Sequence, residues 1–253
     1  MKMSLIPDRI KPSQGYSHLL HLGLVVLLPI IVFIFVRLNN GFIQVALVLI
    51  LLSKWRMLAI RPRYWLANIE ANAIDIIVGV STLVFMVHTG SVLLQLLWAA
   101  LYAAWLIALK PSSNVIGMTA QAVIGQLYGL MALFLEWPSA PLYGLVVGTG
   151  LICYISSRHF FDSFDEPYTK LLAYVWAYFA AALTWVLGHW LLFYGVIAQP
   201  TLFLMVIGFG FAALYYLDHY DRLTTLLRWQ FLSIMAAIIV IVLVFSNWGS
   251  KVV

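Results

Sequence analysis

The sequence predicts an all-α fold: a polytopic bundle of about nine transmembrane helices that forms a single membrane domain over residues 1-253. Three observations lead to this prediction. Of the 253 residues, 64% are hydrophobic and only 9% are charged, whereas soluble domains carry about 25% charged residues. Apolar runs of membrane-spanning length follow one another, and short polar turns separate them. The same composition excludes disordered, collagenous and disulfide-stapled chains, the last because Cys153 is the single cysteine.

A spanning helix needs about 20 mostly apolar residues. By this criterion the predicted spans are 18–36, 38–56, 71–88, 91–109, 112–135, 138–157, 171–197, 200–217 and 227–248. Turn signals such as Pro111-Ser112 and Trp137-Pro138 separate several of them. The second span has the shortest uncharged stretch, because only residues 41–53 lie between its polar ends. In such a span, Lys54 would have to extend its amine to the membrane interface.

The distribution of basic residues predicts the orientation. With the N-terminus in the cytoplasm, twelve of the 14 Lys and Arg residues fall on the cytoplasmic side, and only Arg37 and Lys251 fall outside. This is the positive-inside bias of a plasma or bacterial inner membrane, so we expect the C-terminus outside. The net charge of +5 is explained by the same bias and predicts no nucleic-acid partner. The basic stretch before the first apolar run is interpreted as the start of an uncleaved helix.

Small residues predict which helices pack closely. In the fifth span, Gly117, Gly125 and Gly129 lie with Gln121 at steps of four residues, and in the sixth span Gly144 and Gly148 form a G-x-x-x-G pair. We expect these two helices to pack against each other. The alternative is a glycine-lined passage for a transported small molecule or lipid.

The acidic residues lie almost entirely toward the predicted cytoplasmic side, with Glu136 as the exception. None is predicted at the membrane midplane, which argues against an ion-coupled transporter. The strongest candidate for a catalytic site follows the sixth span and consists of Arg158, His159, Asp162, Asp165 and Glu166. There, carboxylates could hold a divalent cation while an arginine binds phosphate. The alternative is a solvated rim whose opposite charges pair.

Three further arginines are candidates for contact with a substrate or a lipid headgroup. They are Arg61, Arg63 and Arg222, in two other polar clusters of the inner face. Aromatic residues accompany them, as is typical of the membrane interface. No pattern indicates a nucleotide, a hydrolase triad or a metalloprotease, and we predict no cofactor and no metal ligand set.

In outline, the arrangement resembles that of the UbiA-type intramembrane prenyltransferases, which have nine helices and aspartate-rich motifs after the second and sixth. Here Asn68, Glu70 and Asp75 follow the second span, and Asp162 and Asp165 follow the sixth. The sequence departs from the family pattern because the first segment lacks a repeated-aspartate run, and the second reads D-x-x-D-E. The likeness implies a prenyl-diphosphate chemistry but covers no continuous motif.

Three functions remain open from the sequence. The first is a non-catalytic membrane subunit or scaffold whose basic cytoplasmic face contacts membrane lipids, or another membrane or cytoplasmic protein. The second is an intramembrane transferase that acts on a lipid-linked or phosphorylated substrate at the inner leaflet. The third is a small-molecule or lipid transporter. Convergence of the inner carboxylates on one cavity would favour the transferase.

Overall fold

The computed structural model describes residues 16–38, 40–55, 59, 61–189, 193–194 and 197–246, and within them the chain is a helical bundle. The helices are α1 Tyr16–Leu38, α2 Ile43–Leu52, α3 Trp65–His88, α4 Val92–Ala104, α5 Val115–Glu136, α6 Leu142–Asp162, α7 Thr169–Gly188, α8 Gln199–His219 and α9 Thr225–Phe245. A two-residue ladder, β1 Phe193–Tyr194 with β2 Ile197–Ala198, pairs antiparallel between α7 and α8. The all-α prediction is confirmed, apart from this ladder.

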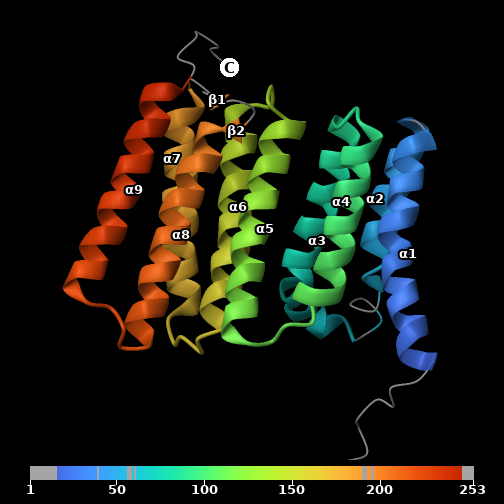
Figure 1. Cartoon of the computed structure of the whole chain (residues 1–253), viewed down its shortest axis with the longest axis horizontal. Helices are drawn as coiled ribbons and strands as arrows, with labels where there is room; N and C mark the ends of the chain where they lie inside the picture. Colours follow the sequence, from blue (N-terminus) through green and yellow to red (C-terminus); the bar gives the residue numbers. More distant parts are fainter. Residues whose placement is uncertain are drawn as a thin grey trace, which may run out of the picture.

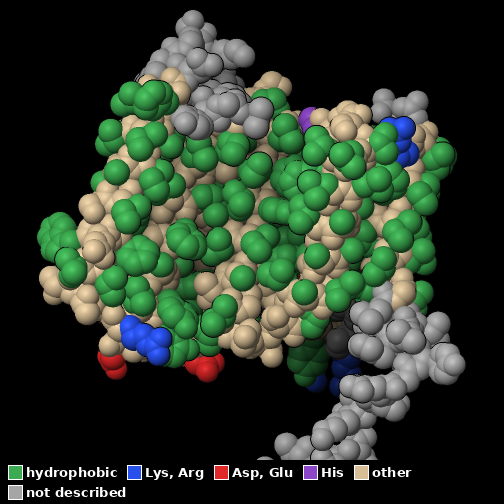
Figure 2. Space-filling view, in the orientation of Figure 1, with side chains coloured by type: hydrophobic (Ala, Val, Ile, Leu, Met, Phe, Trp, Pro, Cys, Tyr) green, Lys and Arg blue, Asp and Glu red, His purple; other side chains and the backbone are tan. Residues whose placement is uncertain are grey.

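The helices stand side by side and alternate in direction (Figure 1). The start of α1 lies at the lower end of the bundle and the end of α9 lies at the upper end. Hydrophobic side chains cover the middle of the face in Figure 2, whereas most charged side chains lie at its lower edge. This distribution fits a protein embedded in a membrane. Which end faces the cytoplasm stays a prediction.

Six helices of the described part are long and apolar enough to cross a membrane. They are α3, α4 with the turn that follows it, α5, α7, α8 and α9. The chain therefore has the helices of an integral, multi-pass membrane protein. Polar residues such as Ser156, Ser157 and Arg158 lower the hydropathy of α6, and α2 is shorter, with ten residues. The count of nine spans stays a prediction.

Two helices, α2 and α7, are much shorter than the predicted spans, whereas α3 begins at Trp65, before its predicted start at 71, and α6 ends at Asp162, beyond its predicted end at 157. At ten residues, α2 is about 15 Å long, half of a hydrocarbon core of about 30 Å. Its C-terminus is followed by Lys54, whose side chain turns into the bundle instead of extending to the interface. The helix α7 ends at Gly188. The backbone lies close to Leu142 there, because a Cβ added to Gly188 would lie 2.2 Å from Leu142 Cδ1.

The central helices α3, α5 and α6 pack through three of the glycines predicted for packing. A Cβ on Gly125 would lie 2.9 Å from Ile74 of α3, and one on Gly148 would lie 3.0 Å from Leu133 of α5. At Gly129 it would meet side chains of both α3 and α6. These contacts place α5 between α3 and α6.

The other two glycines lie in different surroundings. Gly117 contacts the turn before its own helix, where the Asn114 side chain caps α5 by accepting a hydrogen bond from the Gly117 amide at 2.9 Å. Nothing lies within 4 Å of the Cβ position of Gly144, so that position faces open space.

Candidate functional site

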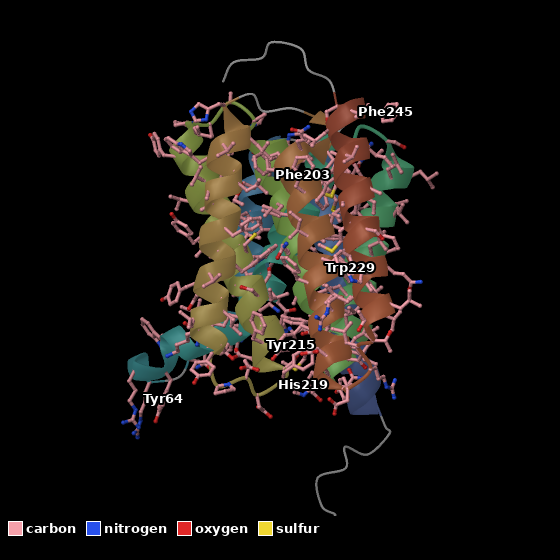
Figure 3. The ribbon with its side chains drawn as sticks, turned by 90° about the vertical axis from the view of Figure 1, so that its left-hand side faces the viewer. Tyr64, Phe203, Tyr215, His219, Trp229 and Phe245 are labelled. Atoms are coloured by element: carbon pink, nitrogen blue, oxygen red, sulfur yellow. The ribbon has the colours of Figure 1, made fainter. Side chains whose placement is uncertain are left out.

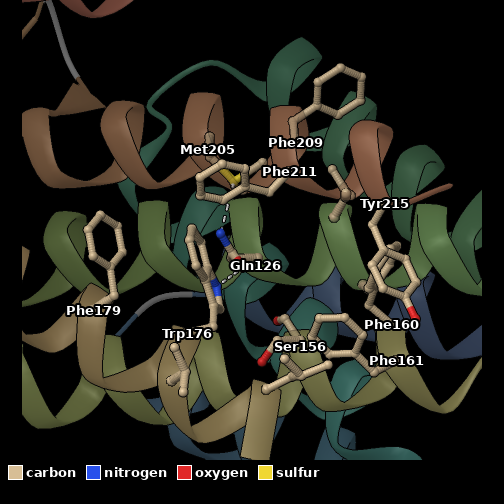
Figure 4. A pocket seen from close by; sticks show the side chains of 17 residues that line it. Gln126, Ser156, Phe160, Phe161, Trp176, Phe179, Met205, Phe209, Phe211 and Tyr215 are labelled. Carbon is tan, nitrogen blue, oxygen red and sulfur yellow. Dashed lines mark hydrogen bonds between the residues drawn. The ribbon is translucent and has the colours of Figure 1, made fainter. Parts of the chain in front are cut away.

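A cavity of about 370 Å³ lies among α5, α6, α7 and α8, in the half of the bundle nearer the lower end (Figure 4). Its lining residues are Ala122, Val123, Gln126, Ser156, Ser157, Phe160, Phe161, Leu172, Val175, Trp176, Phe179, Met205, Gly208, Phe209, Phe211, Ala212 and Tyr215. None of them carries a charge at neutral pH, and seven are aromatic. Cavities of about 300–1,000 Å³ with such walls are typical of sites for small apolar ligands.

The cavity opens between α7 and α8. Lining residues of these two helices also reach the outer surface of the bundle: Val175 and Phe209 are each 59% exposed, and Phe179 is 40% exposed. The helices α5 and α6 close the opposite side. The side chains exposed around this opening are apolar.

A hydrogen-bonded pair fixes the polar part of the wall. The Trp176 indole donates to Gln126 Oε1 at 3.1 Å, and Gln126 Nε2 donates to the Leu204 carbonyl at 3.3 Å. Gly208 leaves room for this pair, because a Cβ there would lie 3.0 Å from Trp176 and 3.1 Å from Gln126 Nε2. Gln126 is therefore held in place by two neighbouring helices.

Aromatic rings surround the lower end of the cavity. Phe160 and Phe161 pack edge-on against Tyr215 at centroid distances of 5.8 and 5.3 Å, and Tyr215 lies near the lower end of α8 (Figure 3). The Tyr215 hydroxyl donates a hydrogen bond to Glu166, in the turn before α7. The Glu166 carboxylate thus lies beside Tyr215 at the lower end of the cavity.

The structure does not gather the three predicted acidic residues around a common point. Asp162 is exposed at the C-terminal end of α6, and Asp165 is exposed in the turn between α6 and α7, where its backbone is left-handed with φ 51°. Glu166 contacts Tyr215 instead. Among the residues that the structure describes, no three His, Cys, Asp or Glu side chains are grouped so as to hold a metal ion.

Arg158 and His159 point to two different partners. The Arg158 guanidinium pairs with Glu70 of α3 at 2.6 Å, which joins two polar clusters that are far apart in sequence. His159 Nε2 lies 2.8 Å from Gln121 Oε1 of α5. Burial lowers the pKa of His159, and the charges of Asp162 and Asp75 oppose this effect.

A buried ionic network that the sequence did not predict lies on the other side of α5. Asp75 Oδ2 accepts from Lys54 Nζ at 2.8 Å and from Lys110 Nζ at 3.1 Å, while Asp75 Oδ1 accepts from the Trp105 indole at 2.9 Å. Trp105 begins a π-helical turn, Trp105–Leu109, that ends α4. Such turns are frequent at functional sites, because they shift side chains out of the regular helical register. Here the turn brings Trp105 and Lys110 to one carboxylate.

The three predicted headgroup arginines are all exposed at the lower end of the bundle. Arg61 and Arg63 precede α3, where Tyr64 stands out from the bundle (Figure 3), and the Arg63 guanidinium lies 4.6 Å from the centre of the Tyr64 ring. Arg222 borders a shallow pocket with Asn114, Tyr216 and Tyr220.

Sequence reasoning named neither Gln126 nor Ser156. Gln126 is a polar residue within an apolar run, and that signal could have identified it, whereas Ser156 begins the polar stretch Ser156-Ser157-Arg158 of α6. Comparison of the chain with known protein families, with characterised proteins and with solved structures gives no match.

Proposed function

We propose that this membrane protein binds a lipid-like molecule, which enters the cavity among α5–α8 sideways from the bilayer. The observation that supports the proposal is the chemistry of the wall: seventeen residues line the cavity and none of them is charged. Apolar and aromatic walls offer an apolar guest contact area without the cost of burying an unpaired charge. The opening between α7 and α8 gives such a guest a path that avoids water.

This proposal keeps the non-catalytic character of the first function open from the sequence, a membrane subunit or scaffold with a basic cytoplasmic face, but assigns lipid binding to an apolar cavity instead of that face. The transferase alternative would need Arg158 and the acidic residues around a shared space. In the described part of the chain, Arg158 pairs with Glu70, Glu166 with Tyr215, and Asp75 with lysines. These separate pairings favour binding over metal-assisted transfer.

Photolabelling tests the proposal. The protein in phosphatidylcholine nanodiscs is exposed to a long-chain alkane that carries a diazirine, and labelled peptides are identified by mass spectrometry. We expect labelling of α7 and α8 at cavity-lining residues. Replacing Ala212 with Phe should fill the cavity and abolish this labelling, whereas Ala213→Phe, at the next position of α8 and outside the lining, should leave it intact. Equal labelling of both variants would contradict the proposal.

The exposed segment before α3 supports a second role. Arg61 and Arg63, beside exposed Tyr64 and Trp65, combine basic and aromatic side chains as segments at an anionic membrane surface do. We propose that they bind anionic headgroups. Replacing both arginines with Gln should lower the number of phosphatidylglycerol molecules that native mass spectrometry finds retained, and an unchanged number would refute this role.

A further inference from the structure

The hydroxyl of Ser156 is the polar group of the cavity wall that has no hydrogen-bond partner among the described residues. The other polar groups of the lining are already engaged. Gln126 and Trp176 bond to each other, Ser157 donates to the Cys153 carbonyl at 2.7 Å, and Tyr215 donates to Glu166. Ser156 is only 1% exposed, and this fraction includes surface that faces the cavity, so its hydroxyl must rotate toward the cavity to meet a guest.

A serine within a helix usually satisfies its hydroxyl by bonding to a carbonyl of the preceding turn. Ser157 does so, but its neighbour Ser156 has no such bond in the structure. Leaving a buried hydroxyl unpaired is unfavourable, because its hydrogen bonds to water are lost without replacement. A guest in the cavity that offers an oxygen acceptor would supply the missing bond.

The rest of the wall limits the charge of this guest. Among the described residues, no Lys, Arg, His, Asp or Glu lines the cavity, so a charged group inside it would have no counter-ion from them. The Gln126 oxygen already accepts from Trp176, and its amide already donates to the Leu204 carbonyl. Ser156 is thus the group available to orient a guest.

We infer that the cavity selects an uncharged lipid-like molecule with a carbonyl or ether oxygen within its apolar body, and that the Ser156 hydroxyl donates a hydrogen bond to this oxygen. The inference rests on the proposed function and adds the class of the ligand. Its apolar body would pack against the rings of Phe160, Phe161 and Trp176, which lie around Ser156 in Figure 4.

Two diazirine probes of equal chain length test the inference in nanodiscs: an alkane, and the same chain with one ketone. Labelling of cavity-lining peptides is divided by labelling of α9, whose residues Trp229 and Val244 are 67% and 65% exposed. This ratio corrects for partition of each probe into the bilayer. A neutral hydrogen bond predicts that the ketone is preferred roughly two- to tenfold in the wild-type protein. The preference should fall to about one in Ser156→Ala.

Thr149 provides the matched control. Its hydroxyl is also buried and without a partner among the described residues, and it lies on the same helix seven residues away, but it does not line the cavity. Thr149→Val should keep the ketone preference of the wild-type protein.

The outcomes separate the two proposals. If neither probe labels the cavity more than α9, the proposed lipid binding fails. If both probes label the cavity equally in the wild-type protein, lipid binding stands and the role of Ser156 is refuted. Loss of labelling by both probes in Ser156→Ala also refutes the hydrogen bond, since the residue would then maintain only the shape of the cavity.

Discussion

Replacing Asp75 with Asn should strongly destabilise the bundle. The substitution keeps the size of the side chain but removes the negative charge that two lysine amines share at 2.8 and 3.1 Å. The Lys54 side chain is only 5% exposed, so after the substitution its charge has neither a counter-ion nor ready access to water.

The distances allow an estimate of the magnitude. At 2.8 Å and an effective dielectric constant of about 20, the attraction between Asp75 and Lys54 is about 6 kcal/mol. Desolvation of the two groups offsets part of it. Breaking a buried ion pair from one side typically costs about 3–5 kcal/mol, and we expect a loss of this size in the free energy of unfolding of Asp75→Asn.

Lys110 is the matched control, because it bonds to the same carboxylate oxygen from a more open position. Its side chain is 39% exposed, so it can extend to water when its partner is lost. Lys110→Met should lower the free energy of unfolding by at most about 1 kcal/mol, as is usual for exposed pairs.

Equilibrium unfolding in mixed micelles with increasing dodecyl sulfate, followed by circular dichroism, measures these losses. The double variant Lys54→Met/Asp75→Asn should be more stable than Asp75→Asn alone, because it removes the uncompensated charge. A loss below 1 kcal/mol in Asp75→Asn, or equal losses in Asp75→Asn and Lys110→Met, would show that the network is solvated and would refute the reasoning.

Four other predictions follow from the fold. Gly148→Leu should overpack the α5–α6 contact and cost about 1–3 kcal/mol of unfolding free energy in the same assay, whereas Gly144→Leu, in open space, should cost little; equal costs would contradict the packing. Exchanging both Asp162 and Asp165 for Asn should change that free energy by at most about 1 kcal/mol, and a larger change would show that these carboxylates do more than face solvent. Burial holds the pKa of His159 below its ordinary value of 6.5, so on acidification the unfolded chain binds a proton at this residue before the folded protein does. The free energy of unfolding should therefore fall as the pH drops below about 6.5. His159→Gln should weaken this pH dependence, and a variant with the same pH profile as the wild-type protein would contradict the role of His159. Reporter fusions to the two termini should lie on opposite sides of the membrane, and a result with both on one side would exclude an odd number of spans.

The sequence predicted the helices well because apolar runs of spanning length have few alternatives in a membrane. It also placed the short turns, as at Pro111-Ser112, where the chain leaves α4 and caps α5 with Asn114. It did not predict the early end of α2, because an apolar run gives no indication that Lys54 turns inward to reach Asp75. Interactions between residues 21 positions apart are invisible to helical periodicity.

The candidate sites could be predicted only in part, for a related reason. Arg158 and Asp162 lie near each other in sequence, but in the bundle Arg158 reaches across to Glu70 on α3. The cavity lies among four helices, and each contributes aromatic or small residues that are ordinary in a membrane helix. Gln126 is the detectable exception, because a polar side chain within an apolar run needs a partner.

The ionic network around Asp75 and the cavity lie on opposite sides of α5 and α6, which form a common wall. On the α3 and α4 side, Gln121 Nε2 donates to the carbonyl of Leu109, at the end of the π-helical turn, and its Oε1 contacts His159. On the α7 and α8 side, Gln126, five residues further along α5, helps to form the cavity. A helix can face two regions in this way because residues five positions apart are separated by about 140° around its axis. The ionic network holds the ends of α2 and α4 to α3 on one side of this wall. The other side presents an apolar surface to the cavity, so stability and the proposed binding depend on different faces of the same two helices.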